Sequence, residues 1–213
     1  MLGIIKKDLY LLKNLNSSFF LFIGVFVLIP VFTGNFTMVT VMLPFIVSTL
    51  TINLLAYDRQ CDWDQYAAAL PVSRRQTVLA QYIVSFSLVA LGSVFGLILA
   101  LIASKFVENA PGYPELFGSA AAGLVCVLIY LSVIIPLTYK FGVEKSRIFI
   151  MMIVMLPMLL MFAFMNSATL EKIESMTNSV SPAAFIAVII IAVAAICAAS
   201  YFISASIYEK KEF

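Results

Sequence analysis

Histidine is absent from the chain, and charged side chains are scarce, with thirteen Lys and Arg and eleven Asp and Glu among 213 residues. The lack of histidine removes the commonest general base, the commonest metal ligand and the usual pH switch. The three cysteines, Cys61, Cys126 and Cys197, are too widely spaced for a CxxC metal or redox motif. We interpret them as small hydrophobic residues with a structural role.

Nucleotide-binding motifs are missing as well. The sequence has no GxxxxGK[ST] loop, which would hold nucleotide phosphates. We therefore expect no cofactor and no metal on this chain. A net charge of only +2 gives no reason to expect a nucleic-acid partner.

Long hydrophobic runs dominate what is present. Hydrophobic residues make up 63% of the chain, charged residues 11%, and the mean hydropathy is +1.07. A typical soluble domain is about 25% charged. The composition therefore predicts a membrane protein.

The uncharged runs are long enough for six membrane-spanning helices, because a bilayer core needs about 20 apolar residues per helix. The first run, residues 14–57, accommodates two helices, with turn-forming residues near Gly34. The sequence predicts an all-α polytopic membrane protein with a single transmembrane domain over residues 1–213. Its spans are expected at about 17–34, 37–57, 76–104, 116–139, 148–166 and 182–208.

Lysine and arginine are distributed unevenly between the expected loops. With the N-terminus inside, the outer loops hold only Lys105 and Lys172, and the inner segments hold the other eleven basic residues. This bias predicts that both termini are cytoplasmic. No ionisable residue needs to lie at mid-membrane, whereas proton- and ion-coupled transporters usually carry such groups. A transport function would therefore draw its energy from another protein.

Residues 56–76 form a polar insert between the second and third expected spans. A short amphipathic helix on the membrane surface is predicted here, with Pro71 ending it. Its apolar positions share one helical face, namely Trp63, Tyr66, Ala67 and Leu70. Ser73 and Gln76 then match a capping box that would start the third span. The insert is interpreted either as an ordinary interfacial loop with an aromatic anchor or as a docking surface for a cytoplasmic partner.

The same stretch resembles a known family. The pairs Tyr57-Asp58 and Trp63-Asp64, followed by Leu70-Pro71-Val72-Ser73-Arg74, resemble the signature between helices 2 and 3 of ABC-2-type transporter permeases. The opening IIKKDLYLLKN is similar to the N-terminal cytoplasmic helix of that family. Within the family, the chain most resembles small permeases of Gram-positive bacteria that export amphipathic peptides or confer resistance to them, such as the phenol-soluble modulin exporters.

The resemblance implies a permease subunit of an exporter in the bacterial cytoplasmic membrane. Two such subunits, identical or different, would pair with two separate ATP-binding-cassette subunits that hold ATP and Mg²⁺. Residues 1–13 would form an interfacial helix that meets membrane lipid, and residues 58–70 would form the coupling helix. The residues expected to couple to the ATPase are Asp58, Arg59, Asp62, Trp63, Asp64, Tyr66 and Leu70.

The path of an amphipathic or hydrophobic peptide is predicted only weakly. Met151, Met155 and Met158 follow a helical stripe in the fifth expected span, and methionine suits surfaces that accept varied apolar ligands. Asn53 could line a cavity from the second span. Each pattern has a structural alternative, since methionine fills gaps in any membrane helix and polar groups often bond to neighbouring helices.

Two other function classes compete with the exporter. An intramembrane enzyme would need a polar constellation, and the spans carry neither histidine nor paired carboxylates. A channel, assembly factor or sensor subunit without ATP coupling remains the alternative, although no charged ring or Gly-rich filter is visible. The chain itself is expected to have no enzymatic activity.

Overall fold

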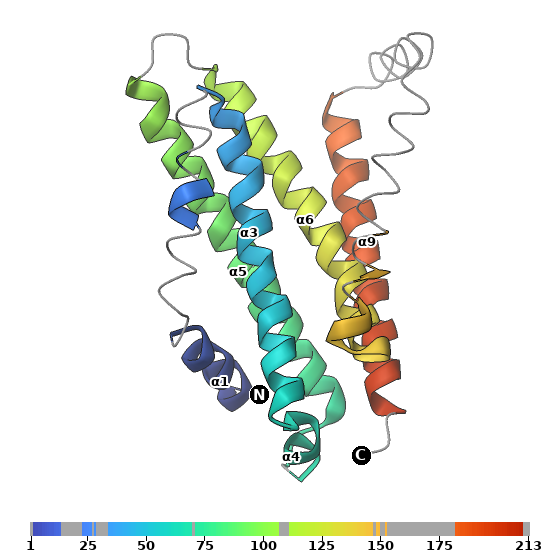
Figure 1. Ribbon diagram of the computed structural model, residues 1–213. Helices are drawn as coiled ribbons and strands as arrows, with labels where there is room; N and C mark the ends of the chain where they lie inside the picture. Colours follow the sequence, from blue (N-terminus) through green and yellow to red (C-terminus); the bar gives the residue numbers. More distant parts are fainter. Residues whose placement is uncertain are drawn as a thin grey trace.

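The computed structural model describes residues 2–13, 23–26, 28, 34–69, 71–106, 111–146, 148–149, 152 and 182–210, and over these residues it contains helices and no strand. Figure 1 shows the arrangement. The elements are α1 (Leu2–Lys13), α3 (Phe36–Gln60), α4 (Trp63–Ala69), α5 (Arg74–Ala103), the 3₁₀ turn η1 (Ser104–Phe106), α6 (Tyr113–Phe141) and α9 (Pro182–Glu209).

Four of these helices are long and apolar enough to cross a membrane: α3, α5, α6 and the Ile186–Glu209 part of α9. The spans expected at 37–57, 76–104, 116–139 and 182–208 fall on them. The all-α class is therefore confirmed for the described residues. Most residues of the spans expected at 17–34 and 148–166 lie outside the described residues, so the count of six stays a prediction.

The start of α5 shows how the sequence sets a helix boundary. The Ser73 hydroxyl accepts a hydrogen bond from the Gln76 backbone N–H, and the Gln76 side chain accepts one from the Ser73 backbone N–H. The predicted capping box is confirmed. It satisfies two backbone donors that the first turn of a helix otherwise leaves unpaired.

The long helices form a bundle in which α3 packs against α5 and α6, and α9 packs against α6 and α5. Glycine permits the closest of these approaches. A Cβ atom added at Gly123 of α6 would lie 3.0 Å from Val41 Cα and 3.2 Å from the Thr40 carbonyl oxygen of α3. At this point the backbone of α6 touches the backbone of α3, because no side chain separates them.

The ends of the bundle are distinct. Phe36, Ala100 and Leu116 are fully buried together where α3 and α6 begin. At the opposite end, which we name the α4 end, α4 follows the last turn of α3, and α1 packs against α3 and α5 (Figure 1). Here Val143 and Tyr208 belong to the main core cluster.

One expected boundary differs from the structure. The coupling helix was expected at 58–70, but Asp58, Arg59 and Gln60 are the last turn of α3, and α4 begins at Trp63. The chain reverses at Cys61 and Asp62, where Asp62 has φ +47°. Helix α3 continues past the apolar run because Lys7 and the end of α6 provide partners for Asp58 and Arg59.

Candidate functional site

Helix α4 has an outward and an inward face. The outward face is exposed and consists of Asp62, Gln65, Tyr66 and Ala69, which follow the i, i+3, i+4, i+7 spacing of one helical face. The inward face holds Ala67, which is 6% exposed, and Trp63, whose indole nitrogen is buried.

The two aromatic residues of α4 were expected to share one helical face, and the structure exposes them to different extents. The Tyr66 side chain is 61% exposed, although its ring centroid lies 5.4 Å from that of Trp63. Trp63 occupies the inner position because Lys7 of α1 covers its ring, with the ammonium 4.2 Å from the ring centroid. Such a cation–π contact stabilises both groups where water is partly excluded.

Lys7 of α1 contacts two carboxylates, Asp8 of its own helix and Asp58 of α3. Its ammonium donates a hydrogen bond to Asp58, and it lies 3.0 Å from Asp8 Oδ1 as an ion pair without hydrogen-bond geometry. The Asp8 side chain is completely buried. Burial raises the pKa of the Asp8 carboxyl, and the neighbouring Lys7 charge partly opposes that rise. One cation therefore serves two carboxylates at this junction.

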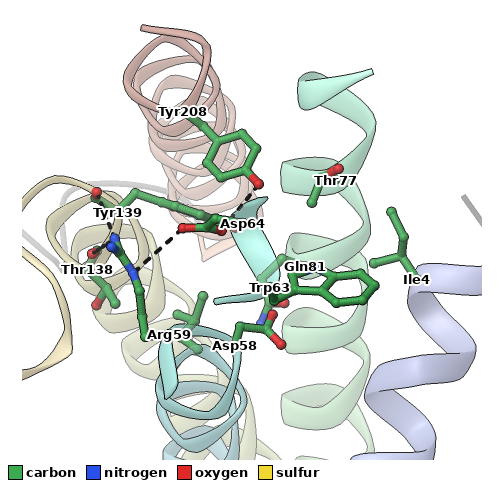
Figure 2. A pocket seen from close by; sticks show the side chains of 11 residues that line it. Ile4, Asp58, Arg59, Trp63, Asp64, Thr77, Gln81, Thr138, Tyr139 and Tyr208 are labelled. Atoms are coloured by element: carbon green, nitrogen blue, oxygen red, sulfur yellow. Dashed lines mark hydrogen bonds and ion pairs between the residues drawn. The ribbon is translucent and has the colours of Figure 1, made fainter. Parts of the chain in front are cut away.

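Arg59 and Asp64 connect α4 to α6 and α9, as Figure 2 shows. The Arg59 guanidinium donates to the carbonyl oxygens of Thr138 and Tyr139, each at 3.3 Å, in the last turn of α6. The last carbonyls of a helix lack partners within it, so a guanidinium is favourable there. Asp64 lies 3.9 Å from Arg59 Nε and accepts a hydrogen bond of 3.2 Å from the Tyr208 hydroxyl of α9.

A small polar cavity lies behind these contacts. Its volume is about 20 Å³, and the residues that line it come from α1, α3, α4, α5, α6 and α9. The polar lining residues include Asp58, Trp63, Asp64, Gln81, Thr138 and Tyr208. Every long described helix therefore meets at the inward face of α4.

A second polar cluster joins α5, α6 and α9 away from charged groups. The Tyr82 hydroxyl lies 2.6 Å from Ser200 Oγ and 2.9 Å from Ser204 Oγ, and the Ser200 hydroxyl donates to the Ser132 carbonyl. This cluster was not predicted from the sequence. Tyr82, the one tyrosine in the long apolar helix α5, was the available signal.

The seven expected coupling residues separate into three groups. Asp62 and Tyr66 lie outward. Asp58, Arg59, Trp63 and Asp64 lie inward, and Leu70 falls outside the described residues. The sequence missed Lys7, Gln81 and Tyr208, because each lies far along the chain from the insert that it contacts.

The expected substrate path is described only at one position. Asn53 is half-buried in α3 and is not among the residues that line the cavity behind α4. Met151, Met155 and Met158 lie outside the described residues. Within the part of the chain that is described, no group of three or more His, Cys, Asp or Glu side chains could hold a metal ion.

These contacts link α4 mechanically to the long helices of the bundle. The outward face of α4 is exposed, whereas Trp63 and Asp64 on its inward face contact α1 and α9, and Arg59 of α3 joins Asp64 to the end of α6. A family model described as ABC-2 family transporter protein matches residues 3–209, which is nearly the whole chain. A search of curated protein sequences gave no match.

Proposed function

Because the chain belongs to the ABC-2 family of transporters, we propose that it is the permease subunit of an exporter driven by a separate ATP-binding-cassette subunit. Proteins of this family are transmembrane components of transport and are not themselves catalytic. ATP and Mg²⁺ would bind to the ATPase partner.

The two-faced geometry of α4 carries this proposal. We assign Asp62, Gln65, Tyr66 and Ala69 to the docking surface for the ATPase, since they form an exposed face with a charge and an aromatic anchor. Asp58, Arg59, Trp63 and Asp64 then link a movement of α4 to the bundle. Their partners on α1, α6 and α9 support this division.

The membrane arrangement follows from the charge distribution. We propose that the α4 end faces the cytoplasm of a bacterial cell, with both termini there and with six spans. Both α6 and α9 run toward the α4 end (Figure 1), which supports a further span between them. The exposed Lys6, Leu9, Tyr10 and Lys13 of α1 line a shallow groove and would meet lipid at the membrane surface.

The proposed substrate is an amphipathic or hydrophobic peptide or a similarly toxic compound, moved by a dimer of permease subunits. Asn53, Met151, Met155 and Met158 remain the proposed path residues. The support is the sequence pattern, since flexible methionines suit varied apolar ligands.

Purification from native membranes in mild detergent tests the proposal. We expect an ATP-binding-cassette protein to co-purify with the chain, with ATP hydrolysis that amphipathic peptides stimulate. The double variant Asp62→Lys/Tyr66→Ala should lose this partner. A matched control, Glu115→Lys/Tyr113→Ala, changes an acidic residue and a tyrosine at the opposite end of the bundle and should retain it.

A variant of the inward face separates docking from coupling. Asp64→Asn leaves the outward face intact, so the ATPase should still co-purify while peptide stimulation of hydrolysis falls. Recovery of the chain without any ATPase would contradict the exporter and favour a channel, assembly or sensor subunit. Loss of the ATPase in Asp64→Asn, but not in Asp62→Lys/Tyr66→Ala, would reverse the assignment of the two faces.

A further inference from the structure

Two buried hydrogen-bond donors at the α4 end have no hydrogen-bond partner among the residues that the structure describes. They are Nε1 of Trp63 on α4 and Nε2 of Gln81 on α5. The Gln81 residue is only 3% exposed. Buried polar groups are nearly always hydrogen-bonded, to protein or to ordered water, so two unpartnered donors in one place require an explanation.

Both side chains line the cavity behind α4, as does Asp58 (Figure 2). The cavity volume is about 20 Å³. A cavity needs on the order of 10–15 Å³ to hold one water molecule, together with two to four polar partners. The volume therefore admits one water and nothing larger.

The charges of the lining select the kind of ligand. Two N–H donors disfavour a bare cation, because a cation needs oxygen acceptors around it. The carboxylates of Asp58 and Asp64 outnumber the Arg59 guanidinium in the lining and so disfavour an anion. Water accepts hydrogen bonds from the two donors and donates to a carboxylate, so it satisfies both kinds of group.

We propose that this cavity is a binding site for one ordered water molecule, which accepts hydrogen bonds from Trp63 Nε1–H and Gln81 Nε2–H and donates to the Asp58 carboxylate. The water then completes the contact between the inward face of α4, helix α5 and the end of α3. The site is independent of the exporter proposal, since it rests only on the lining of the cavity.

Trp63 makes the site measurable, because it is the only tryptophan in the chain. The full-length protein, labelled with ¹⁵N-tryptophan and reconstituted in lipid bilayers, gives one indole N–H signal in proton-detected solid-state NMR. We would measure magnetisation transfer from water to this proton. Rapid transfer is expected, together with slow exchange in D₂O, because the indole nitrogen is buried.

Three variants locate the water. Gln81→Met removes the amide and fills the cavity, so transfer should be lost. Gln81→Ala removes the same amide and enlarges the cavity, so transfer should persist. Gln65→Met makes the same change on the exposed face of α4 and is the matched control, with transfer as in the wild type.

Several results would overturn the proposal. Absence of transfer in the wild type, with an indole shift typical of a direct bond to a carboxylate, would show a dry contact. Unchanged transfer in Gln81→Met would place the water elsewhere. Equal loss in Gln81→Met and Gln81→Ala would show that the signal depends on the amide and not on the cavity. The wild-type measurement stands alone if a variant does not fold.

Discussion

The two polar clusters of the described bundle join helices by different chemistry. The Tyr82 cluster uses only hydroxyl groups and a backbone carbonyl, and it connects α5, α6 and α9 within their apolar runs. The cluster at the α4 end uses Lys7, Asp8 and Asp58, which are charged. Neutral groups join the helices where the surroundings are apolar. Charged groups join them at the α4 end, where the spans end and α1 covers the charges.

The difference has a physical basis. A hydroxyl can bond to a carbonyl of its own helix in any state of the protein, as Ser132 does with the Leu128 carbonyl. Losing its neighbour therefore costs little. A buried carboxylate has no such local substitute, and removing its cation leaves an uncompensated charge. We therefore expect the charged cluster to be the more sensitive of the two.

Removal of the Lys7 cation should have the largest effect. Lys7→Met leaves Asp8 and Asp58 without their shared partner, and we expect a loss of about 3 kcal/mol in the free energy of unfolding. Thermal unfolding in detergent measures the loss. Lys6→Met is the control, because Lys6 is the exposed neighbour on the same helix. Equal stability of the two variants would refute a special role for the charged cluster.

Where α6 passes α3 between the two ends, glycine sets the spacing of the two helices. Gly123→Ala places a methyl group against Val41 and the Thr40 carbonyl, and we expect a loss of about 1–3 kcal/mol from overpacking. Gly118→Ala, on the same helix with nothing within 4 Å, should be neutral or slightly stabilising. Melting temperatures that fall equally in both variants would contradict the close approach of α6 and α3.

The hydroxyl cluster should respond less. Tyr82→Phe keeps the ring and removes the hydroxyl that contacts Ser200 and Ser204, so we expect a loss of about 1 kcal/mol. Tyr113→Phe, at an exposed tyrosine, is the matched control. If Tyr82→Phe were as damaging as Lys7→Met, the contrast between neutral and charged clusters would fail.

Sequence patterns predicted local features of this protein well. The apolar runs located the four long helices, because hydropathy alone decides which segments can span a membrane. The Ser73–Gln76 capping box depends on residues three apart and was equally visible. The LPVSR element gave the family, which the match over residues 3–209 shows.

Contacts between distant segments could not be predicted in the same way. Lys7 and Asp58 are 51 positions apart, and Asp64 and Tyr208 are 144 apart. Nothing in either local sequence specifies its partner, because the pairing depends on how the long helices pack.

The protonation of Asp8 should have the smallest effect on the free energy of unfolding, and this effect depends on pH. Burial raises the pKa of Asp8 in the folded protein, so the native state keeps this proton to a higher pH than the unfolded chain does. The unfolding free energy contributed by Asp8 is therefore fully present below the ordinary aspartate pKa and falls as pH rises through the raised native pKa.

The variant Asp8→Asn should not show this fall in stability with rising pH, since asparagine does not ionise. Its thermal stability relative to the wild type should rise between pH 4 and pH 7. Asp62→Asn, at an exposed carboxyl, controls for the change in net charge. If the relative stability of Asp8→Asn instead fell over this range, the ionised form of Asp8 would stabilise the folded protein. The attraction of Lys7 would then outweigh the cost of burying the Asp8 charge, and the charged cluster would be a stabilising contact at the α4 end.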